Sequence, residues 1–364
     1  MPRVAIAAGG TAGHVVPALA VADALRAEGA EVFFLGARGR LEEQLVPAAG
    51  YEIELLDVRG IDRGNPLRAA AAVARAGRAV PAARRVLRER SADVAMGGGG
   101  YVAGPAGLAA LRLRLPLVLT EADRHLGLAN RLLARRARRV CLAFPIPGRT
   151  GDRYVVTGRP VPAAILRADR DAARERFGIE AERPCLLVFG GSQGARTINL
   201  AALDAFAGRP EAAEDASPRD FHVLHIAGHR DFPLARERLG SGVPDYTLLE
   251  YEPGLADALA ACDLVLARSG GSVFELAAAG RPAILVPYPH ASGDHQRANA
   301  EWMREAGAAA VIEDAELDGA TVARTAGALL SDAKRLSAMS RASASLARPD
   351  AAERVASEIL SVAG

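Results

Sequence analysis

Four times along this chain of 364 residues, a short apolar run ends in a cluster of glycines and is followed by a pattern typical of a helix. The clusters read GGTAGH at 9–14, GGGG at 97–100, GGSQGAR at 190–196 and RSGGS at 268–272. Glycine accepts a positive φ and lets the backbone approach a ligand, and a helix that begins after such a loop presents free N–H groups to an anion. The pattern therefore predicts phosphate-binding loops at the carboxyl ends of parallel strands.

Strand-like and helix-like segments alternate between and beyond these glycine loops. Such alternation is typical of parallel sheets covered by helices on both faces, the doubly wound α/β class. We expect strands near Val4–Ala8, Glu31–Leu35, Glu52–Asp57, Asp93–Gly97, Leu117–Thr120, Arg139–Ala143, Tyr154–Thr157, Cys185–Phe189, Phe221–Ile226, Tyr246–Leu249, Leu264–Ala267, Ala283–Val286 and Ala309–Ile312. Helices such as Pro17–Glu28, Leu67–Glu89, Thr197–Ala207 and Ser272–Ala279 are expected between them.

The strand–glycine–helix opening of residues 4–17 is repeated from residue 185 onward, after the proline-rich segment GRPVPAAI at 158–165. A chain of this length favours two domains over one core. We expect two doubly wound domains, 1–160 and 161–364, that face each other across a cleft. The last helix is free to pack back on the first domain.

Composition limits where the protein works. No apolar run approaches the roughly 20 residues that a membrane-spanning helix needs, and the start MPRVAIAAGG lacks the pattern of a signal peptide. The three cysteines, Cys141, Cys185 and Cys262, are widely spaced in apolar surroundings. They are typical of core residues in a reducing compartment, so we expect a cytoplasmic protein.

Several common functions do not fit the motifs. The first loop reads G-G-x-x-G where a dinucleotide site has G-x-G-x-x-G, and the single lysine, Lys334, is not in a P-loop. Asp169 and Asp171 have the D-x-D spelling of a metal-using transferase, but their place ahead of a helix is better explained by capping. His222, His225 and His229 resemble a ligand cluster, yet residues three apart on a strand face opposite sides, so we expect ordinary positions.

The ordered motifs together resemble the MurG family of lipid II-forming glycosyltransferases, over nearly the whole chain. They are GGTAGH-V-x-P at 9–17, GGGGYVAGPAG at 97–107, GGSQGAR-x-x-N at 190–199, RSGG…E at 268–275 and HQRANA at 295–300. The resemblance implies the GT-B fold and transfer of N-acetylglucosamine from UDP-N-acetylglucosamine to lipid I, the undecaprenyl-diphosphate-linked muramyl pentapeptide. It implies no cofactor and no nucleic-acid partner.

The resemblance also assigns roles to residues. Donor contacts are implied at Thr11, Gly13, Ser192, Gln193, Arg196, Asn199, Arg268, Ser272, Val273, Glu275, His295 and Gln296. Acceptor contacts are implied at Gly10, Tyr101, Asp123 and Asn130. From spacing alone, Glu275 fits equally well as a capping-box carboxylate and as an acceptor for two ribose hydroxyls.

An α-linked donor and a β-1,4 product, as the resemblance implies, require a single inverting displacement with a base for the acceptor hydroxyl. His14 is the first candidate because imidazole titrates near neutral pH. A capping or phosphate-orienting role for His14 stays open, and Glu121 is the competing base or the partner that holds His14. Helix N-termini and Arg268 can carry the charge of the leaving group, so no metal is required.

The chain departs from the family in two motifs, and its second-domain loop is one residue shorter than in some relatives. Thr120-Glu121-Ala122-Asp123 replaces the usual H-E-Q-N, and Gly158-Arg159-Pro160-Val161-Pro162 replaces G-N-P-V-R. The altered stretch 120–123 leaves open a nucleotide-sugar-binding subunit without catalysis. Two further alternatives share the two-domain architecture: another lipid or small-metabolite glycosyltransferase of the GT-B fold, and a UDP-sugar epimerase.

Charge is unevenly distributed. Residues 1–160 carry 24 arginines against 14 acidic residues, and within them 65–90 carries seven arginines and one glutamate. A basic amphipathic stretch of this kind is typical of a membrane-surface element. We expect Arg75, Arg84, Arg85 and Arg88 to attach the protein to the anionic cytoplasmic face of the membrane, with Leu67, Ala71, Val73, Val80, Val86 and Leu87 as the apolar component. A solvated helix face is the alternative.

Overall fold

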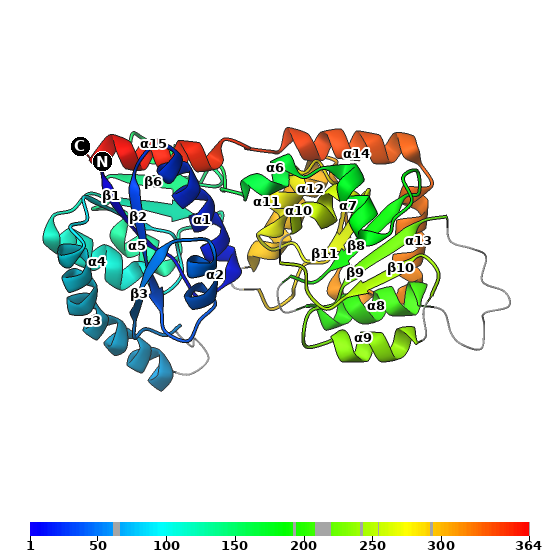
Figure 1. Ribbon diagram of the computed structural model, residues 1–364, viewed down its shortest axis with the longest axis horizontal. Helices are drawn as coiled ribbons and strands as arrows, with labels where there is room; N and C mark the ends of the chain where they lie inside the picture. Colours follow the sequence, from blue (N-terminus) through cyan, green and yellow to red (C-terminus); the bar gives the residue numbers. More distant parts are fainter. Residues whose placement is uncertain are drawn as a thin grey trace. The chain divides into compact units, whose positions relative to one another are not determined.

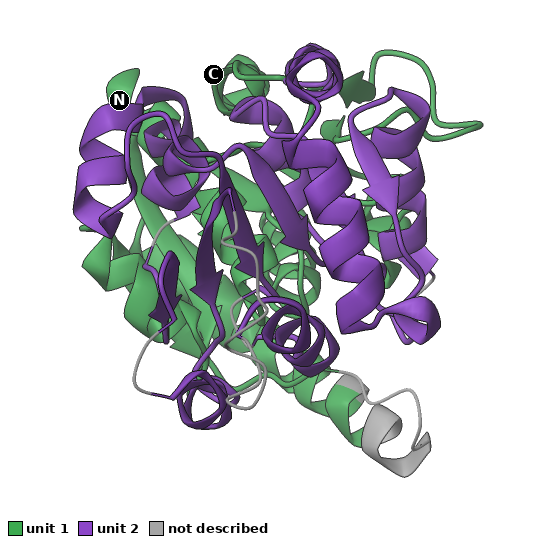
Figure 2. Cartoon of the chain, turned by 90° about the vertical axis from the view of Figure 1, so that its right-hand side faces the viewer, with its two compact units in different colours: residues 1–162, 348–364 green, residues 163–347 purple. Residues whose placement is uncertain are grey.

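The computed structural model describes residues 1–60, 66–191, 194–207, 220–240, 243–253, 255–291 and 294–363, with the backbone alone for 66–70 and 73. The chain forms two compact units (Figures 1 and 2). Unit 1 contains residues 1–162 and 348–364, and unit 2 contains residues 163–347. The change of unit at 162/163 falls within the proline-rich segment, and the last helix belongs with the first unit.

Unit 1 is built on a seven-stranded sheet in the order β3-β2-β1-β4-β5-β6-β7, and every adjacent pair is parallel. Its strands are β1 (Arg3–Ala7), β2 (Glu31–Ala37), β3 (Glu52–Leu56), β4 (Val94–Gly97), β5 (Leu117–Glu121), β6 (Arg139–Leu142) and β7 (Tyr154–Val156). Its helices are α1 (Ala12–Ala27), α2 (Glu42–Ala48), α3 (Pro66–Glu89), α4 (Ala103–Leu113), α5 (Leu128–Leu133) and α15 (Ala351–Ala363).

Alternation along β1 divides the core of unit 1 into two layers. Val4 and Ile6 pack in the layer that contains α1, α2 and α15, whereas Ala5 and Ala7 pack in the layer of α3, α4 and α5. An ion pair of 2.8 Å between Arg139 of β6 and Glu358 also ties α15 to this unit. The carboxyl-terminal helix therefore completes the core of unit 1.

Unit 2 repeats the plan with a six-stranded parallel sheet in the order β10-β9-β8-β11-β12-β13. Its strands are β8 (Cys185–Phe189), β9 (His222–Ile226), β10 (Tyr246–Leu249), β11 (Leu264–Ala267), β12 (Ala283–Leu285) and β13 (Ala309–Val311). Its helices are α6 (Ala163–Arg167), α7 (Arg170–Phe177), α8 (Arg196–Phe206), α9 (Phe232–Leu239), α10 (Leu255–Ala261), α11 (Ser272–Ala278), α12 (His295–Glu305), the 3-10 turn η2 (Asp314–Glu316), α13 (Gly319–Leu330) and α14 (Ala333–Ser345).

Each expected strand is present, with ends that differ by at most two residues. The expected helix Pro17–Glu28 is longer in the structure, since α1 begins at Ala12 and contains Pro17. The prediction placed proline at the start of the helix, whereas the structure shows that the glycine loop leads into α1 directly. One turn of α1 therefore belongs to the first glycine loop.

Strand order explains where the glycine loops lie. In unit 1 the chain runs outward from β1 in one direction and from β4 in the other, and β8 and β11 hold the same places in unit 2. Loops after two such adjacent strands diverge and leave a ligand-binding crevice at the carboxyl edge of the sheet. The loops after β1, β4, β8 and β11 are the four glycine clusters.

Candidate functional site

In unit 1 the first two glycine loops are in direct contact. A Cβ on Gly100 would lie 2.0 Å from the carbonyl oxygen of Gly9, and one on Gly99 would lie 2.5 Å from Cδ2 of His14. Both Gly99 and Gly100 have positive φ, at 95° and 75°. Glycine is required here because the second loop packs on the backbone of the first loop and on the ring of the candidate base.

A carboxylate that sequence reasoning missed holds the first loop. Glu42, at the start of α2, is fully buried and accepts the backbone N–H of Gly10 at 3.0 Å and that of Ala37 at 3.0 Å. The ring of Tyr101 covers the other side of Gly10, since a Cβ there would lie 2.7 Å from Cε1. Glu42 carries no motif, and only the path of α2 brings it to the loop.

His14 lies in the first turn of α1, half-buried, with Nδ1 3.2 Å from Thr11 Oγ1. Burial lowers the pKa of His14, and the nearby positive charge of Arg159 lowers it further, while Asp123 and Glu42 raise it. Arg159 is held by Gly13, whose carbonyl oxygen accepts a hydrogen bond of 2.6 Å from Nη2. The imidazole is therefore biased toward its neutral form.

Glu121 ends β5 and is occupied by its own loop. Its Oε2 accepts the N–H of Gly127 at 2.8 Å and Nδ2 of Asn130 at 2.9 Å, and its Oε1 accepts the N–H of Asp123 at 3.2 Å. Burial raises the pKa of Glu121. Among the described residues no hydrogen bond joins Glu121 to His14, so the idea that Glu121 holds His14 is wrong. Its carboxylate instead organises residues 121–130.

Two of the predicted acceptor residues carry buried polar atoms without a protein partner. In the described part of the chain, Tyr101 Oη and Asn130 Oδ1 are buried and make no hydrogen bond. Burial raises the pKa of Tyr101, so the phenol stays protonated and able to donate. Since buried polar groups are almost always paired, these atoms are candidates for ligand contact.

In unit 2, the loop after β8 leads into α8, and Ser192 and Gln193 lie outside the described residues. Arg196 begins α8 with an exposed side chain, 4.0 Å from Asp231. Asn199 was predicted to contact the donor, but it is only 2% exposed. Its Nδ2 donates to Ala227 O at 2.9 Å and its Oδ1 meets His225 Nε2 at 3.0 Å. The Asn199 side chain is therefore buried and engaged with Ala227 and His225.

Arg268, at the end of β11, is already held by protein groups. Its Nη1 lies 2.6 Å from Asp314 Oδ1, and its Nη2 donates to Thr197 Oγ1 at 2.7 Å. Thr197 in turn donates to Asp314 at 2.8 Å. The loops after β8 and β11 are thus joined at this arginine, which brings its positive charge beside the start of α8.

The remaining predicted donor residues of unit 2 lie in the first turns of α11 and α12. Helix α11 begins at Ser272, with Gly271 as its N-cap. A capping box would place its carboxylate on the third residue of the helix, whereas Glu275 is the fourth. Val273 is fully buried, and its N–H faces the carbonyl of Gly270 at 3.3 Å. The alternative of a capping box is thereby disfavoured.

Gln296 and His295 begin α12 on the other side of this loop. Gln296 Oε1 accepts the N–H of Tyr288 at 3.0 Å, and its Nε2 would lie 3.8 Å from a Cβ on Gly270. Asn299, which sequence reasoning did not single out, is buried and donates to the carbonyl of Ser269 at 3.1 Å. The first two turns of α12 therefore determine the path of residues 269–270.

The D-x-D spelling is explained by capping. Asp169 is the N-cap of α7 and its side chain accepts the N–H of Ala172 at 2.8 Å. In the described residues, no group of three or more histidine, cysteine or acidic side chains is arranged to hold a metal ion. Nor does the described chain contain a helix with the length and apolar character needed to cross a bilayer.

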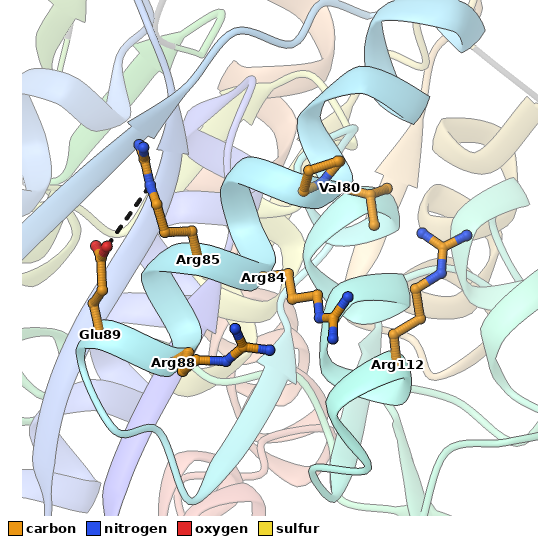
Figure 3. Close-up of a pocket in the computed structure, with 7 residues that line it drawn as sticks. Val80, Arg84, Arg85, Arg88, Glu89 and Arg112 are labelled. Atoms are coloured by element: carbon orange, nitrogen blue, oxygen red, sulfur yellow. Dashed lines mark ion pairs between the residues drawn. The ribbon is translucent and has the colours of Figure 1, made fainter.

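Arginines gather where α3 packs on α4 (Figure 3). A pocket at this place is lined by Val80, Pro81, Arg84, Arg85, Arg88, Glu89 and Arg112. We call the part of the protein surface around this pocket the α3–α4 arginine surface. Arg84 and Arg88 extend toward the side of α4 that carries Arg112, whereas Arg85 faces Glu89 at 3.9 Å. Arg112 was not predicted, because it lies on a different helix.

The prediction that apolar residues of 65–90 contact the membrane is wrong for Val80, Val86 and Leu87. Val80, Val86 and Leu87 are 3%, 9% and 1% exposed and belong to the core beneath α3. Their helical spacing served to pack α3 on the sheet and not to meet a membrane. Arg75 lies apart from the pocket, 3.6 Å from Asp57, and the side chains of Leu67 and Val73 lie outside the described residues.

Comparison with known proteins gives the family. Residues 4–142 match the glycosyltransferase family 28 N-terminal domain and residues 185–355 match the glycosyltransferase family 28 C-terminal domain. A protein of Halorhodospira halophila named UDP-N-acetylglucosamine–N-acetylmuramyl-(pentapeptide) pyrophosphoryl-undecaprenol N-acetylglucosamine transferase is 44% identical over 356 residues, 97% of this chain and 96% of the relative.

Solved structures agree. The crystal structure of Acinetobacter baumannii MurG has a TM-score of 0.76 at 30% identity and covers 99% of this chain and 100% of that one. A putative UDP-N-acetylglucosamine 2-epimerase from Listeria monocytogenes, with a TM-score of 0.72 at 18% identity over 99% of this chain and 96% of its own, shares the fold alone. The chain has the GT-B fold and belongs to glycosyltransferase family 28, among the UDP-N-acetylglucosamine–N-acetylmuramyl-(pentapeptide) pyrophosphoryl-undecaprenol N-acetylglucosamine transferases.

Proposed function

We propose that this enzyme transfers N-acetylglucosamine from UDP-N-acetylglucosamine to the muramyl 4-hydroxyl of lipid I and so forms lipid II. The observation that carries the proposal is the match to relatives with this activity in their name over 97% of the chain. In the step, the acceptor oxygen forms a bond to the anomeric carbon, the bond from that carbon to the diphosphate breaks, and UDP leaves with the electron pair. The hydroxyl proton goes to a base.

His14 is the base that the geometry favours. We assign the tautomer with the proton on Nδ1: it donates to Thr11 Oγ1, 3.2 Å away, and leaves the lone pair of Nε2 for the acceptor. Gly99 has no side chain to cover that edge of the ring. The competing base, Glu121, accepts three N–H groups from its own loop, and moving it would leave those donors unpaired.

For the leaving group, we propose that Arg196 and the N-terminus of α8 face the donor diphosphate, supported by the charge of Arg268. The unpaired N–H groups at the start of a helix stabilise negative charge that develops on a phosphate. Glu275, on the first turn of α11, is proposed to accept the two ribose hydroxyls. On the acceptor side, Tyr101 Oη and Asn130 Oδ1 supply a donor and an acceptor that lack protein partners among the described residues.

The test is turnover of UDP-N-acetylglucosamine with and without a water-soluble lipid I analogue. Acceptor-dependent release of UDP together with a β-1,4 disaccharide product supports the proposal. Conversion of the sugar without acceptor would point to an epimerase, and UDP binding without any turnover would point to a non-catalytic subunit. Transfer to a different acceptor alone would leave a GT-B glycosyltransferase of another specificity.

We further propose that the enzyme acts as a peripheral protein on an anionic cytoplasmic membrane surface, held by the α3–α4 arginine surface. Support comes from the exposed Arg84, Arg88 and Arg112 around one pocket. Each such arginine is worth about 1 kcal/mol near an anionic surface. Since Val80, Val86 and Leu87 of α3 face the core, the attachment is expected to be electrostatic and reversible.

A further inference from the structure

A chain of buried hydrogen bonds runs through unit 2 beneath the start of α8. Tyr246 Oη lies 2.7 Å from His225 Nδ1, His225 Nε2 lies 3.0 Å from Asn199 Oδ1, and Asn199 Nδ2 lies 3.1 Å from Asp231 Oδ2. His225, Asn199 and Asp231 are 0%, 2% and 2% exposed. The reaction proposed above gives no task to Tyr246, His225 or Asp231.

In this series of hydrogen bonds each side chain donates to the next, from Tyr246 to Asp231. Asn199 Nδ2 also donates to the carbonyl of Ala227 at 2.9 Å, so the amide nitrogen faces two acceptors and the amide oxygen requires a donor. That donor is His225 Nε2–H, which leaves Nδ1 to accept from the Tyr246 hydroxyl. Burial lowers the pKa of His225 to about 4, so the imidazole is neutral, as this pattern requires. Each residue therefore fixes the orientation of the next.

The chain ends at the segments that carry the proposed donor contacts. Asn199 is the fourth residue of α8, and Asp231, the N-cap of α9, also lies 4.0 Å from Arg196. Gly194 packs on Ala227 so closely that a Cβ would lie 2.3 Å from the carbonyl oxygen of Ala227. Residues 194–196 thus rest directly on the groups that Asn199 binds.

We propose that His225, acting through Asn199, is a positioning residue for the donor diphosphate: it fixes the start of α8 and Arg196 relative to β9. The inference rests on the proposed function, since it assumes that a diphosphate binds at this helix start. Phosphate recognition by backbone N–H groups depends on their placement to within about half an ångström. A change of the Asn199 side chain would rotate the first turn of α8 and move these groups.

His225→Phe tests this, because it keeps a ring of similar size but leaves Asn199 Oδ1 buried without a donor. His225→Gln is the conservative variant, since its amide retains an N–H. His222→Phe is the matched control. His222 is a buried histidine on the same strand, three residues away; its Nε2 lies 2.9 Å from Thr247 Oγ1, and it takes no part in the hydrogen bonds that link Tyr246 to Asp231. The measurements are the Kd for UDP, kcat, the KM values for donor and acceptor, and Tm. Binding and kinetics are measured at a temperature well below the lowest Tm among the variants.

We expect His225→Phe to raise the Kd for UDP and the donor KM about tenfold, with an unchanged acceptor KM. His225→Gln should recover part of this, and His222→Phe should bind UDP like the unmodified enzyme. An unchanged donor KM, equal rises in both KM values, or the same defect in His222→Phe would overturn the proposal. If His225→Phe does not fold, Tyr246→Phe decides: a weaker UDP affinity supports the inference and an unchanged affinity refutes it. If the unmodified enzyme does not bind UDP, the proposed function fails instead.

Discussion

Arg159 Nη2 donates a hydrogen bond of 2.6 Å to the carbonyl oxygen of Gly13. Pro17, four residues further along α1, has no N–H to offer this carbonyl, so the guanidinium takes the place of the missing helical bond. Burial lowers the pKa of His14 most, and the permanent positive charge that this contact brings close to the imidazole lowers it further. A departure from the family motif therefore bears on the candidate base.

Replacing Arg159 by Gln should move the pH dependence of catalysis. A general base works in its neutral form, so activity rises with pH through the pKa of His14. Loss of the arginine charge raises this pKa, and the acidic limb of kcat/KM should shift to higher pH. The control variant is Arg149→Gln, which replaces an arginine that lies near Tyr154. An unmoved acidic limb would mean that His14 is not the titrating group.

Replacing His14 by Ala should lower kcat about 100-fold while the Kd for UDP stays close to that of the unmodified enzyme, because a general base contributes to the chemical step and not to nucleotide affinity. Glu121→Gln should lower activity less and should lower Tm, since Glu121 accepts three N–H groups. The opposite ranking, with Glu121→Gln inactive and His14→Ala active, would assign the base to Glu121.

Replacing Glu275 by Ala should raise the KM for UDP-N-acetylglucosamine much more than that for the acceptor. Loss of a charge-assisted contact to two ribose hydroxyls costs on the order of 2–3 kcal/mol. Glu301→Ala, in an exposed residue of α12 that pairs with Arg304, is the matched control and should change neither KM. Equal effects of Glu275→Ala on both substrates would return this residue to a structural role.

Gly100 and Gly148 separate conformational strain from loop packing. Both have positive φ, at 75° and 71°, so alanine strains either backbone by about 1 kcal/mol. Only at Gly100 does a Cβ meet another atom, Gly9 O at 2.0 Å, whereas nothing lies within 4 Å at Gly148. Gly100→Ala should therefore lose most activity, and Gly148→Ala should keep it. Comparable turnover in both variants, assayed well below their Tm, would show that the packing of the two loops is not needed.

Combined replacement of Arg84, Arg88 and Arg112 by Gln should weaken binding to phosphatidylglycerol vesicles and reduce its dependence on salt. Loss of about 1 kcal/mol per arginine should lower the vesicle partition coefficient by two orders of magnitude or more. Turnover of a water-soluble acceptor should be unchanged. A control with Arg324, Arg335 and Arg341 of unit 2, all exposed, should bind vesicles normally. Binding that ignores both salt and the α3–α4 substitutions would contradict the proposed surface.

The sequence by itself determined the strands and the positions of the glycine loops between them. Strands such as Cys185–Phe189 and Leu264–Ala267 were predicted to the residue, because a continuous apolar run followed by glycine has few other solutions in a parallel sheet. The boundary near residue 160 followed from proline, which resists regular structure. These signals are local, and local signals can be read along the chain.

Contacts between distant segments were decided only by the tertiary structure. Glu42 under Gly10, Arg112 beside Arg84, and His225 behind Asn199 join residues that are 32, 28 and 26 positions apart, and no motif marks them as partners. The prediction that Val86 contacts the membrane was wrong for the same reason: its helical spacing predicts an apolar face but not what covers that face. Burial and hydrogen-bond partners depend on which elements the sheet order brings together, and that order is a property of the whole fold.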